Sequence, residues 1–387
     1  MRRLFVVLVN VFLFVNFFRA LAGGEESISK LWEPLLSVNS KCRRFVQVVG
    51  NNDGLGDQLE RMFVALTLAW RHRDDGVTLA LSDDFGKHSM HGSGYLNVMK
   101  SVFGLPMDKI RRASSIMEKF KPTTISMEGT KFGEYMTHKR KFTDDTPCDT
   151  ITVVDIFDAC GGHWCPLLWL EQISEGLGEL LPETYARNGG YCRRYNMADA
   201  SSQLNVVWHI RVFDHVSASH TCRSCKPGYF SGLDTFVGAA VADLNNRSTR
   251  AGGVMLTRKD IVVHREVKST ISQTDVLQPL KNATRIHSED LKEVLCTLAN
   301  ADLLVTTGSS LPATLVYFLP KHRPVVLEEA RLTNDAYLFG TNPHKSFPYF
   351  PFKHAMPPGR SFHMLNGQPD QNVTEAAIAE ALAAFMK

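Results

Sequence analysis

The sequence predicts an α/β protein of two domains, and three observations lead to this prediction. The chain has 387 residues, more than a single hydrophobic core usually supports. Short apolar runs alternate with helical patterns in both halves, which is the order found in parallel sheets. Residues 188–202 are largely polar and contain Gly189 and Gly190, as expected of a boundary. We therefore expect α/β domains at 40–200 and 203–350, facing each other across a cleft, and an extension with a helix at 351–387.

In the first half, a buried strand is predicted at 45–49, followed by a glycine-rich turn at 50–58. Apolar residues at helical spacing predict a helix at 59–70, and a second strand follows at 77–81. The stretch 85–150 lacks a clear period and is expected to be irregular, with some helices whose bounds cannot be assigned. A further strand at 151–155 and a helix at 167–181 complete this half.

In the second half the alternation is cleaner. Strands are predicted at 205–209, 254–256, 261–263, 284–287, 303–306 and 324–327. Helices are predicted at 229–244, 289–299 and 311–318, and an amphipathic helix at 374–386. Helices between successive strands are the crossovers that a parallel sheet requires.

The N-terminus resembles a targeting segment. A basic start, Met1-Arg2-Arg3, precedes a mostly apolar run at 4–18, and Ala20 and Ala22 have the spacing of a cleavage site. Residues 1–22 are therefore expected to be a secretory signal peptide, and the alternative is an uncleaved membrane anchor. Either way the rest of the chain reaches the secretory lumen, in the Golgi or endoplasmic reticulum, or is secreted. Three glycosylation triplets agree, at Asn246, Asn282 and Asn372.

The eight cysteines also suit an oxidising compartment, where an even set can pair, although the pairing itself cannot be read from the sequence. Cys222 and Cys225 form a C-x-x-C, which favours a short disulfide over half a zinc site or a redox pair, because no second C-x-x-C exists. The charge is nearly balanced, with 43 basic and 40 acidic side chains. There is accordingly no electrostatic case for a nucleic-acid partner.

The segment from Trp208 to Asp214 is the strongest candidate for chemistry. An apolar strand there leads into His209, Arg211 and Asp214. Ligands bind at the carboxyl ends of strands in open α/β sheets, and a guanidinium can grip a phosphate with two hydrogen bonds. The alternative is a plain strand that runs into a solvated loop.

A second candidate is the glycine-rich turn. Gly54 and Gly56 allow a ligand to approach the backbone at the start of a helix, and Asp57 and Gln58 follow. Asp57 and Gln58 are equally well explained as helix caps. The glycine pattern of a P-loop or a complete dinucleotide fingerprint is missing.

Two further candidates follow later strands. The loop with Gly308, Ser309 and Ser310 offers amides and hydroxyls at a helix N-terminus, which is an anion site or simply a helix start. Glu289 and Asp290 follow the predicted strand 284–287, where they either bind a base or ribose or only favour the helix start. No D-x-D, G-x-S-x-G or H-E-x-x-H occurs, so serine-hydrolase and zinc-protease chemistry lacks support and no metal site is expected.

Taken in order, these motifs resemble the fucosyltransferase-like glycosyltransferases, which have two facing Rossmann-like domains of GT-B type. The resemblance extends over residues 46–328 but only at separate motifs. These are G-x-G-x-Q, H-x-R-x-x-D, the acidic pair Glu289 and Asp290, and T-x-G-S-S. It departs from the family forms at Val212, Phe213 and Asp57, where a second Arg, a small residue and an Asn are usual.

The resemblance implies a role for each matching position. Arg211 would grip the donor diphosphate, with His209 and Asp214 shaping the strand end. Gly308, Ser309 and Ser310 would bind the same phosphates. Glu289 and Asp290 would lie near the nucleoside, and Gly54, Gly56 and Gln58 would line the cleft, with Asp57 a candidate base.

The expected activity is metal-independent transfer of a sugar, fucose from GDP-fucose in the first instance, to a glycan or glycoprotein, with no cofactor. Two alternatives stay open. One is a glycosyltransferase that uses another nucleotide sugar. The other, favoured by Val212 and Phe213, is a lumenal carbohydrate- or nucleotide-binding protein without catalysis.

Overall fold

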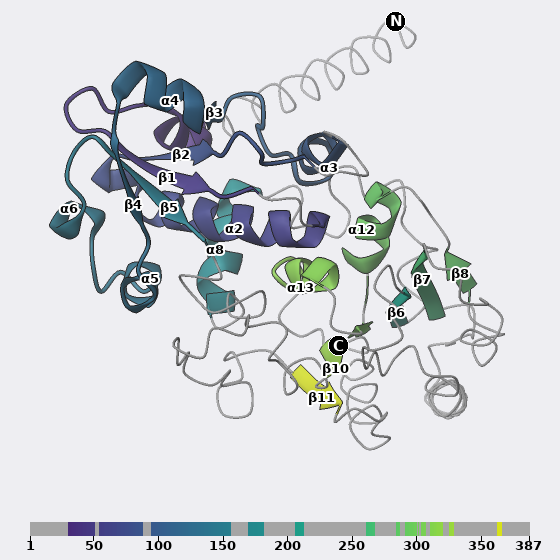
Figure 1. Ribbon diagram of the computed structural model, residues 1–387. Coiled ribbons are helices and arrows are strands. Elements are labelled where there is room, and N and C mark those ends of the chain that lie inside the picture. Colours follow the sequence, from purple (N-terminus) through teal and green to yellow (C-terminus); the bar gives the residue numbers. More distant parts are fainter. Residues whose placement is uncertain are drawn as a thin grey trace, which may run out of the picture.

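The computed structural model describes the chain at residues 30–50, 54–87, 94–155, 169–181, 206–212, 261–267, 284–286, 291–299, 301, 303–306, 310–319, 325–328 and 362–365. It is an α/β protein with two separate parallel sheets, which confirms the predicted class (Figure 1). The targeting segment at 1–22, the helices at 229–244 and 374–386 and the strand at 254–256 lie outside the described residues.

The first sheet has the strand order β3-β2-β1-β5-β4. Its strands are β1 (Arg44–Val48), β2 (Val77–Leu81), β3 (Arg111–Arg112), β4 (Thr123–Ser126) and β5 (Thr150–Val154). β1 pairs in parallel with β2 on one side and with β5 on the other. β2 and the apolar positions of β1 and β5 are buried, apart from the half-buried Val153, as expected of central parallel strands.

Helix α2 (Leu55–Arg71) follows β1 and begins four residues earlier than the sequence predicts. Apolar periodicity starts at Leu59, but Leu55 is also buried, so the glycine-containing segment forms the first helical turn. Gly54 is the N-cap residue and makes no side-chain cap bond. Nearly every residue from Leu55 to Trp70 is buried, so α2 is a central helix rather than a surface one.

The stretch 85–150 contains the expected helices and is more regular than the sequence predicts. It contains β3, β4 and the helices α3 (Gly94–Phe103), α4 (Ala113–Phe120), α5 (Gly129–Met136) and α6 (Phe142–Asp145). These elements are short and separated by turns with left-handed residues, at Gly104, Lys121 and His138. Such turns break the hydrophobic period that a sequence pattern needs.

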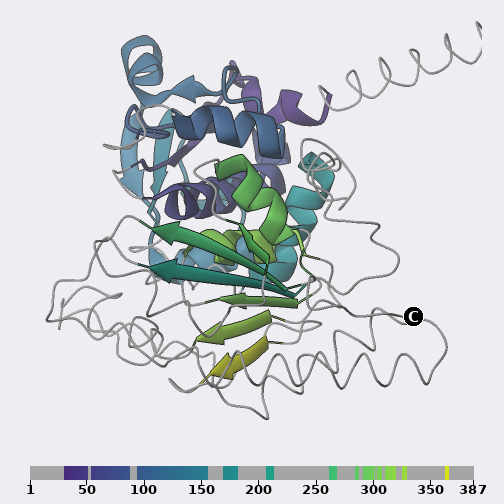
Figure 2. The same cartoon turned by 90° about the vertical axis from the view of Figure 1, so that its right-hand side faces the viewer.

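The second sheet has the order β11-β10-β9-β6-β7-β8. Its strands are β6 (Val206–Val212), β7 (Ile261–Val267), β8 (Thr284–Ile286), β9 (Leu303–Thr306), β10 (Val325–Glu328) and β11 (Phe362–Leu365). Neighbouring strands in this sheet pair in parallel, and Figure 2 shows the arrows running in one direction. β6 and β7 are longer than predicted, and β11 was not predicted.

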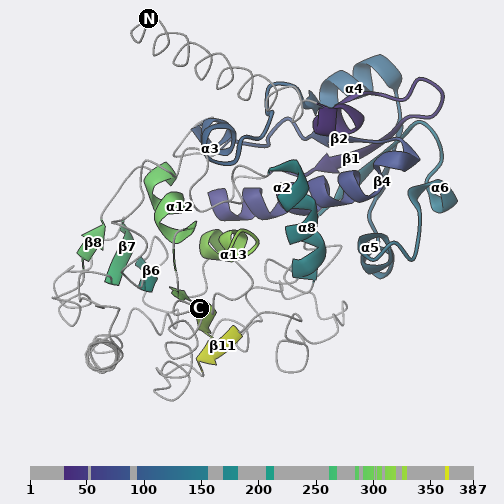
Figure 3. The same cartoon turned by 180° about the vertical axis from the view of Figure 1, so that it is seen from behind.

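Further helices are α8 (Leu170–Leu180), α12 (Leu291–Ala299) and α13 (Ser310–Val316), and a 3-10 helix, η1 (Arg73–Asp75), follows α2. α2 and α13 lie side by side between the two sheets (Figures 1 and 3). Phe63 on α2 is fully buried there, with ring centroids 5.2 Å from Phe318 and 6.2 Å from Tyr317. The hydroxyl of Ser174 donates to the backbone carbonyl of Tyr317 at 3.1 Å. One apolar core therefore contains residues from both sheets' helices.

A disulfide joins Cys42, just before β1, to Cys148, just before β5. Cys296 on α12 is also disulfide-bonded. Within the described ranges, no helix has both the length and the apolar character needed to cross a membrane.

Candidate functional site

The strand order of the second sheet locates a ligand site. From β6 the chain builds outward to β7 and then β8, and it then returns to place β9, β10 and β11 on the other side of β6. The order therefore reverses between β6 and β9, as in dinucleotide-binding sheets. In such sheets the ligand lies outside the carboxyl ends of the two strands at the reversal.

Two of the predicted phosphate-binding segments flank this reversal. Register places His209 of β6 beside Thr306, the last residue of β9, and Arg211 lies two positions further along β6. Ser310 is the first residue of α13, so the loop 307–309 joins β9 to that helix at the same edge. Asp214, Gly308 and Ser309 lie outside the described residues.

β6 extends three residues beyond the predicted end, and Arg211 lies within the strand rather than after it. Hydrogen bonding to β7 continues along this extension, with Arg211 beside Glu266 and Val212 beside Val267. Pairing on one side is enough to keep the backbone extended. Arg211 therefore occupies a defined register position in the sheet.

β7 brings two residues to this edge that sequence reasoning missed. His264 is the register partner of His209, and Glu266 is the register partner of Arg211. The predicted strand stopped at Val263 because the polar run 264–266 broke the apolar pattern. Val267, a β-branched residue beyond that run, was the signal for a longer strand.

The predicted acidic pair, Glu289 and Asp290, follows β8 in the sequence, and β8 is the strand next to β7. β8 ends at Ile286 and α12 begins at Leu291, so Glu289 and Asp290 belong to the connection between them and lie outside the described residues. β8 ends at the same carboxyl edge as β6 and β9. The strands that precede these motifs in the sequence thus end at one edge of one sheet.

The glycine-rich turn belongs to the other sheet. Gly54, Gly56 and Asp57 lie at the N-terminus of α2, after β1, and Asp57 is half-buried in the first turn. A carboxylate at that position interacts favourably with the helix dipole. A side chain at Gly54 would meet no heavy atom within 4 Å, so the start of α2 borders open space.

Gln58 has a buried structural contact instead of the cleft position we expected. Its side chain is fully buried. Its amide nitrogen donates to the backbone carbonyl of Lys87 at 3.0 Å, and its amide oxygen accepts from the N–H of Gly86 at 2.7 Å. Gln58 therefore ties the turn after β2 to helix α2.

Helix α2 carries buried charge. The Arg61 side chain is 1% exposed, and its Nη1 lies 3.5 Å from Oδ1 of Asp155, the residue after β5. Glu60 is buried on the same helix, and burial together with the Glu60 charge raises the pKa of Tyr317 well above its ordinary value. Burying an ionisable group this deeply costs free energy unless partners compensate its charge. Such groups are therefore candidates for functional residues.

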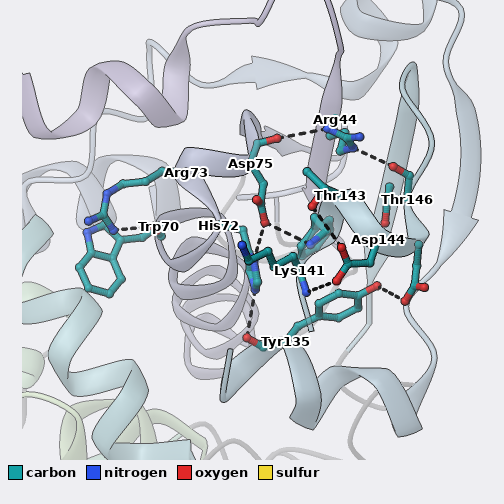
Figure 4. A network of polar contacts seen from close by, with 12 residues as sticks. Arg44, Trp70, His72, Arg73, Asp75, Tyr135, Lys141, Thr143, Asp144 and Thr146 are labelled. Carbon is teal, nitrogen blue, oxygen red and sulfur yellow. Dashed lines mark hydrogen bonds and ion pairs between the residues drawn. The ribbon is translucent and has the colours of Figure 1, made fainter. Parts of the chain in front are cut away.

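A histidine and an aspartate at the far end of α2 look like a catalytic pair but are structural (Figure 4). His72 Nδ1 lies 3.0 Å from Asp75 Oδ2, and its Nε2 lies 3.0 Å from the carbonyl oxygen of Tyr135. Both ring nitrogens are thus engaged by the protein, and the ring is buried. Since α2 starts at the carboxyl edge of the sheet, this network lies at the opposite edge from the candidate sites.

Metal ligands do not gather in the part of the chain that the structure describes, where no group of three His, Cys, Asp or Glu side chains is placed to hold an ion. Metal independence stays a prediction from the sequence.

No protein-family model matches the sequence, and no match is found among curated proteins. Among solved structures the chain is similar to the fucosyltransferase NodZ from Bradyrhizobium, with 13% identity and a TM-score of 0.35 over 72% of this chain and 92% of that one. It is also similar to the E. coli heptosyltransferase WaaC with ADP, with 11% identity and a TM-score of 0.36 over 89% and 100%. A glycosyl transferase family 9 structure from Veillonella parvula shows 12% identity and a TM-score of 0.39 over 89% and 97%. At these values the likeness carries no argument about activity.

Proposed function

We propose that the chain is a glycosyltransferase of the secretory lumen that transfers a sugar, fucose from GDP-fucose, to a glycan or glycoprotein without a metal ion. One observation carries the proposal: β6, which contains Arg211, and β9, which is followed by the helix that begins at Ser310, are the two strands at which the order of the second sheet reverses. That is where open α/β sheets bind nucleotides. The fold of two facing GT-B domains belongs to the same proposal.

The chemistry follows from the charge of the leaving group. Breaking the bond between sugar and phosphate builds negative charge on the departing diphosphate. Fixed hydrogen-bond donors aimed at that charge lower the barrier. Arg211 supplies a guanidinium, and Ser309 and Ser310 supply amides and hydroxyls from the facing loop. His209 and Asp214 shape the strand end, and Glu289 and Asp290 accept hydrogen bonds from the nucleoside.

The lumenal location rests on the N-terminal segment and on the cysteines. Cys42 and Cys148 pair with each other, and Cys296 is also disulfide-bonded. Structural disulfides persist in oxidising compartments and are rare in the cytosol.

The decisive variant is Arg211→Ala. We expect its turnover of GDP-fucose to fall by a factor of about 100 or more, which corresponds to a loss of about 3 kcal/mol of charge stabilisation. The matched control is Arg43→Ala, because Arg43 precedes β1 at the opposite edge of the other sheet. Donor consumption and thermal unfolding are measured on the same samples. Near-normal turnover by folded Arg211→Ala protein would eliminate the mechanism.

A second candidate function is a nucleotide- or carbohydrate-binding protein without catalysis. Val212 and Phe213 favour it, because a second guanidinium is missing beside Arg211 and bulk is added. A thermal-shift comparison of GDP with UDP, followed by donor consumption, separates the candidates. Binding of GDP without turnover selects the binding protein, and a preference for UDP selects another nucleotide sugar.

A further inference from the structure

Arg61 and Asp155 form a partly buried ion pair that links α2 to the end of β5. The Arg61 side chain is 1% exposed and the Asp155 side chain 31% exposed, with 3.5 Å between Nη1 and Oδ1. The neighbours of Arg61 along the helix include the fully buried Leu59 and Phe63. Such a pair stabilises a fold poorly compared with apolar residues, because both charges lose solvation. The Arg61–Asp155 pair is therefore a candidate for a role other than stabilising the fold.

The position of Asp155 indicates that role. It is the first residue after β5, which is paired with β1. From β1 the chain passes through α2 to β2 on one side, whereas β5 lies on the other side. The order of the first sheet therefore reverses between β1 and β5, and Asp155 lies at the carboxyl edge of that reversal. Open α/β sheets bind ligands outside the carboxyl ends of the two strands at such a reversal. The donor site proposed in the second sheet follows from this rule, which predicts a ligand site here as well.

The same edge also has room. Gly54, the N-cap residue of α2, makes no side-chain cap bond, and a Cβ added to it would meet no heavy atom within 4 Å. Gly50, by contrast, is closed, since a Cβ there would lie 2.3 Å from the backbone nitrogen of Phe85. The open position is therefore at the start of α2, and Arg61 on that helix contacts the carboxylate of Asp155.

We propose that Asp155, held by Arg61, is the carboxylate that binds the acceptor hydroxyl and takes up its proton. This inference rests on the proposed glycosyltransferase function. The hydroxyl oxygen bonds to the anomeric carbon, and the bond from that carbon to the diphosphate breaks with its electron pair on the diphosphate. The proton of the hydroxyl passes to Asp155. When water is the acceptor, the same step is donor hydrolysis.

The test uses GDP-fucose and water, so it does not depend on knowing the glycan. We expect Asp155→Asn to lower the rate of GDP-fucose hydrolysis at least tenfold while the Kd for GDP stays within about twofold. The matched control is Asp149→Asn. Asp149 also pairs with an arginine, Arg43, but it precedes β5 at the opposite edge. Its hydrolysis rate should match that of the unaltered protein.

Asp155→Asn leaves a buried guanidinium beside a neutral amide and can unfold the protein. The double variant Arg61→Met/Asp155→Asn removes both charges and serves as the second test, with the same expected loss of hydrolysis. Asp155→Glu should recover part of the rate. A folded variant without the carboxylate that hydrolyses GDP-fucose at the unaltered rate overturns the inference. A folded variant whose GDP affinity falls by the same factor as its hydrolysis rate also overturns the inference.

Failure of the proposed function looks different. In that case the unaltered protein neither binds GDP nor consumes GDP-fucose, and the inference is overturned together with it. If the unaltered protein binds GDP but consumes no donor, the donor site stands and the role of Asp155 is overturned.

Discussion

Arg211 on β6 and Glu266 on β7 are register partners in a parallel strand pair of the second sheet. The two backbones at such positions lie about 5 Å apart, so we expect the opposite charges of this pair to influence each other. The residue proposed to bind the diphosphate therefore has a carboxylate as its neighbour. We expect this neighbour to reduce the positive charge that Arg211 presents to a ligand.

We expect Glu266→Gln to tighten GDP binding by a factor of about 3–10 at low ionic strength, because it removes a negative charge near the phosphates. The gain should shrink as salt is added, since screening weakens the repulsion. Titration calorimetry at two salt concentrations measures both effects. Glu118→Gln, on an exposed position of α4, is the control. Weaker binding by Glu266→Gln would instead mean that Glu266 holds Arg211 in position.

Gln58 should matter for folding rather than for the ligand. Gln58→Leu leaves the Gly86 N–H and the Lys87 carbonyl without their side-chain partner, at a cost of about 1–3 kcal/mol for each group that stays buried. Urea unfolding measures the loss, with Gln47→Leu on the neighbouring strand β1 as the control. GDP affinity should be unchanged. Unchanged stability with weakened GDP binding would return Gln58 to the ligand site.

The disulfide between Cys42 and Cys148 closes a long loop, with a sequence separation of 106 residues. Replacing both cysteines with serine should lower the free energy of unfolding by about 2–5 kcal/mol, because the unfolded chain regains the freedom that the crosslink removes. Chemical denaturation measures the change. Reduction of the unaltered protein should produce a shift in the same direction, and a double variant as stable as the unaltered protein would contradict the expectation.

Tyr135 should make the protein sensitive to alkali. Burial, opposed by a hydrogen bond with Thr146 and assisted by the nearby Asp145 carboxylate, raises the pKa of its phenol to about 12. The neutral phenol is thus favoured in the folded state, and its contribution to stability is lost as pH rises from about 10 through about 12. Tyr135→Phe should therefore lose less stability than the unaltered protein over this window. Denaturation curves at about pH 8 and about pH 11 compare the two, and parallel losses would exclude Tyr135 as the cause.

The strands were the most predictable part of the fold. The strands at 77–81 and 303–306 have the predicted bounds, because runs of β-branched and apolar residues are local signals. In 85–150 the strands were missed and the helices were expected without bounds, because these elements are short and their turns interrupt the pattern. β7 was cut short for a related reason, since its polar residues carry no apolar period.

The candidate site was predictable only as separate pieces. The sequence located His209, Arg211, the Ser310 loop and the glycine-rich turn one by one. It did not indicate Glu266 or Asp155, because nothing near either residue in the chain sets it apart. Their interest comes entirely from neighbours that are distant in sequence, Arg211 and Arg61.

By itself, the sequence determined which segments become strands and helices and which of them end in groups able to bind an anion, because these properties depend on residues within a few positions of one another. The tertiary structure alone decided the order of the strands and their register, the partner of Cys42 and the burial of Gln58. These features arise from contacts between residues tens to hundreds of positions apart. Such contacts form only when whole elements pack, and no local pattern encodes them.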